Sequence, residues 1–355
     1  MASDRVLSIQ SHVAFGYVGG KAAVFPLQCL GYDVDVVNTV NFSNHSGYGR
    51  FGGSRTNAAE LKTIFDIMSQ NGLLRPSRLL TGYIPGGEAV SAVAELAERL
   101  RKENPDLIYL LDPVLGDAGK LYVAPDVIPI YRSMLPLSTI ITPNWFEVET
   151  LTEVEIKDPA SLKEAFRVLH ETYGVPHAVM SSIPLKGWLL DILSPAVRPP
   201  DHLDDEYLLC ISSSAQPTNS NSAHPSVVHA HCVPLIPGYF SGVGDLFSAL
   251  VLAHFTSPTS ASTASPATTP LSRAVALALA KTHAVLSRTQ DHFLSLPEDE
   301  RIMTDDEKDQ ADPNRRVTRM RGRELRLVQS QDIIRGDLRL KDGFMGLWGG
   351  FWDLC

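Results

Sequence analysis

Residues 238–250, with the sequence GYFSGVGDLFSAL, place two glycines and a carboxylate at the start of an apolar stretch. Gly242 and Gly244 allow the backbone to pass close to a ligand, and their N–H groups can converge at the N-terminus of a helix that begins near Asp245. Phosphate is the ligand that such a site favours, because the N–H groups and the helix dipole both attract anions. The stretch therefore predicts an anion site.

Asp245 is the candidate general base of this site. A bound phosphate repels a neighbouring carboxylate, so the carboxylate needs a function there, and accepting the proton of an attacking hydroxyl group is one. The alternative is an aspartate that only caps the helix, which explains most Gly-x-Gly-Asp sequences taken alone. Other segments of the chain must decide between the two.

The composition is that of a large α/β protein. The chain has 355 residues, 44% of them hydrophobic, which is enough to build one substantial core. The first residues form no basic and apolar leader, and no uncharged apolar run approaches membrane-spanning length, so we expect a cytoplasmic protein, with the nucleus as a further compartment and no membrane partner. Four widely spaced cysteines, without a Cys-x-x-Cys pair, predict reduced thiols.

The formal charge of −9 disfavours a nucleic-acid partner. One basic cluster departs from this balance and follows the acidic stretch 298–309. We interpret the cluster as an exposed polar insert. Its members are Arg315, Arg316, Arg319, Arg321, Arg323 and Arg326.

Short apolar strands alternate with helical patterns along the first half of the chain. Strands are expected at 5–10, 33–38, 79–81, 107–112, 139–142 and 178–181, and helices at 21–30, 88–102 and 161–173. This order predicts a mostly parallel sheet covered by helices. Three later strands, at 187–193, 206–212 and 227–235, follow one another without helices and predict an antiparallel edge.

The chain reads as a single domain, residues 1–355, with three insertions. Residues 212–226, 256–270 and 297–316 are rich in Ser, Thr and Pro or in charge, so we expect mobile surface loops there. The aromatic C-terminal tail, 343–355, is expected either to contact a partner or to fold onto the domain.

Polar residues follow the expected strands at the ends where α/β proteins bind ligands. These residues are Asp112, Asp117, Asn144, Glu147, Ser181 and Ser182. Carboxylates and neutral oxygens suit Mg²⁺ bridging nucleotide phosphates. Two alternatives stay open: Asn144 and Glu147 also form the pattern of a capping box, and the two serines could start a turn.

Two glycine motifs are misleading. Residues 47–52, GYGRFG, match a dinucleotide-binding fingerprint, but they lie in a polar, glycine-rich stretch without a strand-to-helix junction. Gly19-Gly-Lys21 lacks the first glycine and the final hydroxyl of a P-loop. We therefore assign neither a dinucleotide site nor a P-loop to the chain.

Seven motifs, in order along the chain, together resemble the pyridoxal kinase family of the ribokinase-like superfamily. They are SIQSH (8–12), GYVG (16–19), NHSGY (44–48), LTGY (80–83), DPVLGD (112–117), TPN (142–144) and GVGD (242–245), and ELRLVQS (324–330) is a further similar stretch. The resemblance implies a ribokinase-like α/β fold, with a mostly parallel central sheet flanked by helices and an antiparallel edge.

The resemblance also implies an activity, the ATP-dependent phosphorylation of the 5′-hydroxymethyl group of pyridoxal, and of pyridoxine and pyridoxamine, in vitamin B6 salvage. Two alternatives are a hydroxymethylpyrimidine kinase of the same superfamily and a non-catalytic vitamin-binding relative. Retention of Asp245 with both of its glycines argues against lost catalysis. Homodimers are implied by resemblance only.

The resemblance assigns roles to individual residues. In the vitamin site, Ser11 would meet the pyridine nitrogen, Ser46 the phenolic oxygen and Tyr83 the ring face, while Val18 lines the pocket and Asp245 accepts the proton. In the ATP site, the roles would fall to Asp112, Asp117, Tyr122, Asn144, Glu147, Ser181 and Ser182, with the amides of Gly242, Val243 and Gly244 neutralising charge. Mg²⁺ would be organised by Asp112, Asp117 and Glu147, and a K⁺-type ion would be held by Thr142 and Asp112.

Two departures from the family pattern affect this site. Ser46 stands where many members carry threonine, which preserves the hydroxyl group. Val243 replaces the threonine of some relatives, so one side-chain contact to phosphate would be lost while the backbone donors remain.

Overall fold

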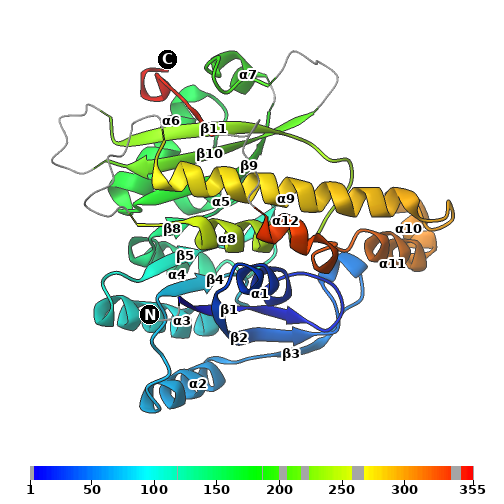
Figure 1. Ribbon diagram of the computed structural model, residues 1–355, viewed down its shortest axis with the longest axis horizontal. Coiled ribbons are helices and arrows are strands. Elements are labelled where there is room, and N and C mark those ends of the chain that lie inside the picture. The colour runs from blue at the N-terminus through cyan, green and yellow to red at the C-terminus, as the bar shows by residue number, and fades with distance from the viewer. Residues whose placement is uncertain are drawn as a thin grey trace.

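The computed structural model describes residues 4–117, 119–185, 187–199, 206–216, 224–257, 268–336 and 345–354. Helices cover both faces of one twisted sheet (Figure 1). The ten strands lie in the order β12-β11-β10-β9-β8-β5-β4-β1-β2-β3, and β6 and β7 form a separate two-stranded sheet.

The six neighbouring strands from β9 to β2 are parallel, and the strands at both edges pair antiparallel. The strands are β1 (Arg5–Val13), β2 (Asp33–Phe42), β3 (Gly53–Arg55), β4 (Arg78–Thr81), β5 (Ile108–Leu111), β6 (Gly116–Asp117), β7 (Lys120–Leu121), β8 (Ile140–Ile141), β9 (His177–Pro184), β10 (Tyr207–Ala215), β11 (Ser226–Pro234) and β12 (Gly346–Leu347). The predicted mostly parallel sheet with an antiparallel edge is confirmed.

The α-helices of the described residues lie between these strands and after them. They are α1 (Gly20–Cys29), α2 (Ala58–Gln70), α3 (Gly87–Glu103), α4 (Val127–Met134), α5 (Trp145–Thr152), α6 (Pro159–Arg167), α7 (Trp188–Ile192), α8 (Val243–His254), α9 (Pro270–Ser295), α10 (Asp306–Ala311), α11 (Pro313–Gly322) and α12 (Gln331–Arg335). A π-helical turn, Val168–Thr172, extends α6. None of the helices in these described ranges is long and apolar enough to cross a lipid bilayer.

Alternating side chains of the parallel strands build two cores, one on each face of the sheet. In β4, Leu79 belongs to the core under α2 to α6, while its neighbour Leu80 belongs to the core under α1, α8 and α9. In β5, Leu111 and Leu110 divide in the same way. Residues buried on both faces explain why these strands are continuous apolar runs.

One expected strand is wrong. Residues 187–193 contain α7 instead, with Leu189 and Leu193 buried and Leu190 exposed between them. That spacing of four residues between buried leucines is helical. Periodicity alone does not separate a short buried helix from a strand in so brief an apolar run.

The expected insertions are partly ordered elements. Residues 212–215 belong to β10. Ser213 is buried there, and its hydroxyl is satisfied by hydrogen bonds with His170 and Ser226. Thr269 forms the capping box that starts α9. Most of the remaining parts of the first two insertions, 217–223 and 258–267, lie outside the described residues.

The third insertion, 297–316, contains α10 and the start of α11 rather than loop alone. Asp305 and Asp312 cap the two helices through their side chains, and Pro313 occupies the first turn of α11. These acidic residues and the proline are helix-start signals that the charged composition obscured. Arg319 and Arg323 are buried, so the interpretation of the basic cluster as exposed is wrong for these two residues.

The described part of the C-terminal tail folds onto the domain. Gly346–Leu347 forms β12 against β11, and Trp348 and Phe351 are 2% and 1% exposed. The ring of Phe351 packs edge-on against Phe166 of α6. The tail therefore extends the sheet and closes one end of the core.

We expect Phe351→Ala to lower the free energy of unfolding by about 3–5 kcal/mol, because it opens a cavity in this core. Leu347→Ala, at a side chain that is 38% exposed, is the control and should cost about 1 kcal/mol or less. Urea unfolding of both variants measures the difference. Equal losses would show that the tail does not belong to the core.

Candidate active site

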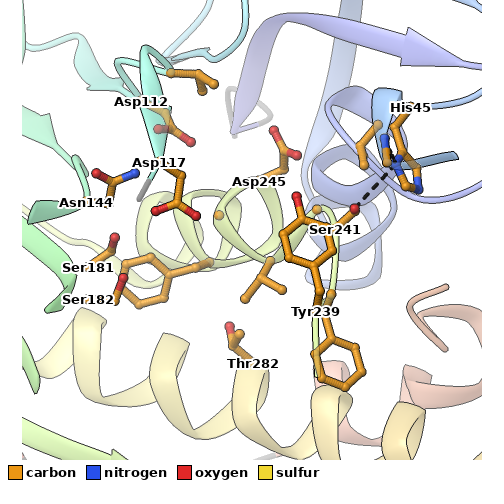
Figure 2. A pocket seen from close by; sticks show the side chains of 18 of the residues that line it. His45, Asp112, Asp117, Asn144, Ser181, Ser182, Tyr239, Ser241, Asp245 and Thr282 are labelled. Atoms are coloured by element: carbon orange, nitrogen blue, oxygen red, sulfur yellow. Dashed lines mark hydrogen bonds between the residues drawn. The ribbon is translucent and has the colours of Figure 1, made fainter. Parts of the chain in front are cut away.

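A cavity of about 840 Å³ opens near the carboxyl ends of the parallel strands and beside the first turn of α8. It is lined by every residue to which the sequence assigned a site role (Figure 2). These residues are Ser11, Val18, Ser46, Tyr83, Asp112, Asp117, Tyr122, Thr142, Asn144, Glu147, Ser181, Ser182, Gly242, Val243, Gly244 and Asp245. The structure therefore brings all of them to one place.

The first turn of α8 packs against the loop between β1 and α1. Gly242 has a φ of 79°, and a Cβ at this position would collide with the carbonyl oxygen of Tyr17. The backbone N–H of Gly19 donates to Oδ2 of Asp245 over 2.8 Å. Glycine is thus required at 242, and the Asp245 carboxylate is fixed at the start of the helix rather than capping it, because no side chain caps α8.

Asp112 and Asp245 bring two carboxylates into the same cavity. Oδ2 of Asp112 accepts a hydrogen bond from Ser248 over 3.0 Å, and Ser248 also bonds Thr142 over 2.8 Å. Burial, together with the charge of Asp245, raises the pKa of Asp112 to about 8. Burial also raises the pKa of Asp245, against the opposing hydrogen bond from Gly19. Neutralising this pair needs a proton or a cation.

Asn144 and Glu147 form the capping box of α5, so that alternative is confirmed. Oε1 of Glu147 also accepts from the backbone N–H of Leu115 over 2.8 Å, and Oε2 accepts from Asn144 N over 2.9 Å. Asn144 in turn donates to the carbonyl oxygen of Gly116 over 2.8 Å. Both side chains therefore hold the 112–117 loop in addition to lining the cavity.

Burial raises the pKa of Glu147 well above its ordinary value, with a further contribution from the charge of Asp112. Three backbone hydrogen bonds oppose this shift. Asp117 lies in β6 and faces the same space as Asp112 and Asp245 in Figure 2. The cavity thus gathers several carboxyl groups, and burial opposes the ionisation of Asp112, Glu147 and Asp245.

Ser181 and Ser182 lie within β9, so the alternative that they start a turn is wrong. Their strand continues to Pro184 because it pairs with β10 on that side. Figure 2 places both hydroxyl groups on the same side of the cavity as Asn144 and Asp117. Tyr122, which is 55% exposed, lines the cavity just after β7.

Ser11, Val18, Ser46 and Tyr83 line the part of the cavity formed by β1 and by the segments that follow β1, β2 and β4. Thr39 Oγ1 donates to the Tyr83 carbonyl oxygen over 2.7 Å and fixes the loop after β4. The residues of the rejected fingerprint form a short 3₁₀ helix, Ser46–Tyr48, and then lead into β3. They lead from the 3₁₀ helix into β3 and not from a strand into an α-helix, which is the junction that a dinucleotide fingerprint needs.

Several lining residues were missed by the sequence reasoning. Apolar side chains from β10, β11 and α9 line another part of the cavity, among them Leu208, Cys210, Val233, Leu279 and Leu286. Thr282 of α9 also lines it, and its buried hydroxyl has no hydrogen-bond partner among the described residues. These residues have no local motif, and they meet only because α9 packs across the sheet.

His45, Tyr239 and Ser241 were missed as well, although they lie within or beside quoted motifs. Figure 2 shows Ser241 bonded to His45 across the cavity from Asp112. His45 lies in the motif NHSGY, in which Ser46 already had a role, so the sequence gave no separate signal for the histidine.

The oxygen-rich side of the cavity fits a hard cation that arrives with phosphate. Asp112, Asp117 and Thr142 supply oxygen atoms there, and the raised pKa of Asp112 shows that its negative charge lacks compensation. Among the described residues no group of three or more His, Cys, Asp or Glu side chains forms a metal cage. A cation that keeps waters and binds largely through phosphate needs no such cage.

Comparison with known proteins identifies the family. A putative pyridoxal kinase of Saccharomyces cerevisiae is 42% identical over 254 residues, which cover 70% of this chain and 73% of that protein. A pyridoxal kinase of Arabidopsis thaliana is 37% identical over 334 residues, which cover 94% of this chain and 92% of that protein. The chain belongs to the pyridoxal kinase family.

Two further comparisons agree with this family. The structure of pyridoxal kinase from Leishmania donovani in complex with ADP and pyridoxamine superposes with a TM-score of 0.73 at 31% identity, over 95% of this chain and 97% of that one. The family model described as phosphomethylpyrimidine kinase matches residues 57–196. The ribokinase-like fold of the pyridoxal kinase family is therefore confirmed for this chain.

We expect Gly242→Ala to lower the free energy of unfolding by about 1–3 kcal/mol, because alanine is strained at its φ and has no room beside Tyr17. Gly244→Ala is the matched control, since its Cβ meets nothing within 4 Å and its backbone is helical. That control should be neutral or more stable by up to about 1 kcal/mol. Thermal unfolding without ligands compares the two variants, and equal stabilities would contradict the packing described.

The pKa of Asp112 predicts a pH-dependent stability. Because folding raises this pKa, its stabilising contribution is complete below the ordinary pKa of an aspartate and is lost as the pH rises toward about 8. Asp112→Asn should therefore raise the melting temperature of the ligand-free protein at pH 8 and leave it nearly unchanged at pH 4. A variant that gains nothing at pH 8 would contradict the raised pKa.

Proposed function

We propose that this protein transfers the γ-phosphoryl group of ATP to the 5′-hydroxymethyl group of pyridoxal, and of pyridoxine and pyridoxamine, in vitamin B6 salvage. The observation that supports the proposal most strongly is the position of Asp245. Its carboxylate, fixed by Gly19, lies in Figure 2 between His45, which precedes Ser46 in the chain, and Asp112 with Asn144.

Asp245 acts as the general base. Burial raises its pKa, so the carboxylate accepts a proton more readily than an exposed aspartate does. The proton comes from the hydroxymethyl group of the vitamin as its oxygen attacks the γ-phosphorus. The Gly19 hydrogen bond occupies Oδ2, so we expect Oδ1 to accept this proton.

The N-terminus of α8 stabilises the charge that develops on the transferred phosphoryl group. The amides of Gly242, Val243 and Gly244 belong to the helix start, where the backbone N–H groups have no intrahelical acceptor. Preorganised donors of this kind contribute much of the rate in phosphoryl transfer. Val243 takes part through its backbone, so its apolar side chain does not weaken the site.

ATP occupies the side of the cavity that contains Asp117, Tyr122, Asn144, Ser181 and Ser182. The apolar side chains of β10, β11 and α9 accept the base, and the unpartnered hydroxyl of Thr282 offers a contact to the nucleoside. Glu147 keeps the 112–117 loop in position, and Asn144 shares that role.

Mg²⁺ is the cation proposed for the oxygen-rich side, with Asp112, Asp117 and Glu147 organising it directly or through water. When bound, it would neutralise charge on the ATP phosphates. A K⁺-type ion is proposed beside Thr142 and Asp112, where Ser248 already joins the two side chains.

The vitamin occupies the remaining side. Ser11 offers a hydroxyl to the pyridine nitrogen, Ser46 one to the phenolic oxygen, and Tyr83 and Val18 supply flat and apolar surface. The Leishmania donovani relative binds pyridoxamine together with ADP, which supports the same pairing of ligands here.

A hydroxymethylpyrimidine kinase is the second candidate, because the phosphomethylpyrimidine kinase model matches residues 57–196. That match covers the central part of the chain and leaves out Ser11, Val18 and Ser46. The alignment with the Arabidopsis thaliana pyridoxal kinase covers 94% of the chain, which favours pyridoxal as the substrate. Two further parts of the proposal stay predictions: a homodimer, from the resemblance, and a cytoplasmic or nuclear location, from the sequence pattern.

Asp245→Asn tests the base. The variant should bind ADP and pyridoxal about as tightly as the wild type, while kcat for pyridoxal phosphorylation falls ~10²–10⁴-fold. Asp66→Asn, at an exposed side chain of α2, is the control and should retain full activity. A kcat for Asp245→Asn within about threefold of the wild-type value would remove Asp245 from the mechanism.

A further inference from the structure

Arg323 and Glu324 are two adjacent residues near the end of the chain that contact three segments bordering the cavity. Both side chains are largely covered, with Arg323 only 4% exposed. Neither belongs to the described residues that line the cavity. Glu324 and Arg323 contact different parts of the chain.

The Glu324 carboxylate joins two loops that carry the vitamin-side residues. Oε2 accepts the backbone N–H of Tyr17 over 2.8 Å, in the loop between β1 and α1. Oε1 accepts from Tyr48 Oη over 2.8 Å and bonds Nε2 of His45 over 3.1 Å. Ser46 therefore lies between two side chains that Glu324 holds, and Val18 directly follows the third contact.

The tautomer of His45 follows from its other contacts. Its Nδ1 accepts the backbone N–H of Gly47 over 3.1 Å, so the proton of the neutral ring resides on Nε2 and is donated to Glu324. Burial by itself would raise the pKa of Glu324, but the hydrogen bonds from His45, Tyr48 and Tyr17 lower it, so the group stays ionised. The carboxylate thus receives three donors and no acceptor.

Arg323 holds a second loop of the cavity, the one between β11 and α8. Its Nη1 donates to the Pro237 carbonyl oxygen over 3.0 Å, and its guanidinium lies 5.3 Å from the ring centroid of Phe240 and 4.0 Å from that of Phe293 on α9. Gly238 leaves room for the guanidinium, because a Cβ there would collide with it. This loop continues directly into Ser241 and the anion site of α8.

The segment before this pair adds a contact of its own. Arg316 of α11 donates to the carbonyl oxygen of Gly47 over 2.6 Å, so α11 also contacts the 3₁₀ helix that bears Ser46. Ser241 Oγ lies 3.4 Å from Nδ1 of His45 and connects the two loops directly. The vitamin-side loops and the loop leading to the base are therefore fixed from one short segment.

We propose that Arg323 and Glu324 are a pair of positioning residues, in which Glu324 sets the geometry of the vitamin site and Arg323 that of the catalytic loop. The proposal rests on the proposed function for its kinetic consequences. The hydrogen bonds of Glu324 and Arg323 are formed within the protein, so their effect on the loops can be tested whatever the substrate is.

Glu324→Gln tests the first half with a side chain of equal size. Tyr17 N–H and His45 Nε2–H are both donors, so the amide NH₂ of glutamine must face one of them whichever way it turns. We expect the KM for pyridoxal to rise about tenfold or more, the range of a lost hydrogen bond to a charged group, with the KM for ATP changing less than about twofold.

Arg323→Met tests the second half, because methionine keeps apolar contact with Phe240 and Phe293 but loses the donor to Pro237. We expect kcat to fall about tenfold while the KM for pyridoxal changes less than about twofold. Asp309→Asn is the matched control: it removes the charge that pairs with Arg319 on α11, over 2.6 Å, at a residue that lines no loop of the cavity. It should lower stability and leave both KM values and kcat nearly unchanged.

Hydrogen exchange gives a readout that does not depend on activity. In Glu324→Gln, the amides of Tyr17 and Gly47 should exchange faster than in the wild type, whereas Asp309→Asn should leave them unchanged. If the wild type fails to phosphorylate pyridoxal, the proposed function fails, yet the exchange rates still decide whether Glu324 holds the loops. Exchange rates or kinetics in Glu324→Gln that match those of Asp309→Asn would overturn the proposal.

Discussion

The packing of the first turn of α8 against the loop after β1 is the contact on which the site depends. Gly242 has no side chain, so the helix start can lie against the Tyr17 carbonyl, and Gly19 N–H then reaches Asp245 over 2.8 Å. This approach joins the ends of the first strand and of a late helix. It places Asp245, the start of α8 and the residues proposed to bind the vitamin around one cavity.

The free-energy cost of ionising buried carboxyl groups is the second organising feature of the site. Burial opposes the ionisation of both Asp112 and Asp245. The charge of Asp245 opposes the ionisation of Asp112 further. A bound cation with its phosphates lowers this cost, so the empty site is less favourable electrostatically than the loaded one. Burial also makes Asp245 a better proton acceptor than an exposed aspartate, as the proposed general base requires.

Much of the site was predictable because its residues sit in local motifs at the ends of strands. Asp112 directly follows β5, and Asn144 follows β8 after two residues, so chain order and the rule for parallel sheets bring them together. The capping-box alternative for Asn144 and Glu147 proved true alongside their place in the cavity, since one side chain can cap a helix and hold a loop.

The parts that sequence reasoning missed depend on long-range packing. Residues 187–193 were too short an apolar run to separate strand from helix, and Leu189 and Leu193 settle it only through burial. Thr282 lies in a long helix without a motif, and Glu324 acts through contacts with residues about 280 to 307 positions away, such as His45 and Tyr17. The charge pattern of residues 297–316 suggested a loop because helix caps and surface loops use the same acidic residues.

The most direct test of the account is turnover by the purified protein with ATP and Mg²⁺, given pyridoxal and hydroxymethylpyrimidine in equal concentration. The account predicts that pyridoxal 5′-phosphate forms much faster than the phosphorylated pyrimidine, with stoichiometric release of ADP. Preferential phosphorylation of the pyrimidine would contradict the assignment of Ser11, Ser46 and Tyr83 to a pyridine ring. Tight binding of pyridoxal without any phosphoryl transfer would contradict the central claim that Asp245 and the start of α8 form a catalytic site.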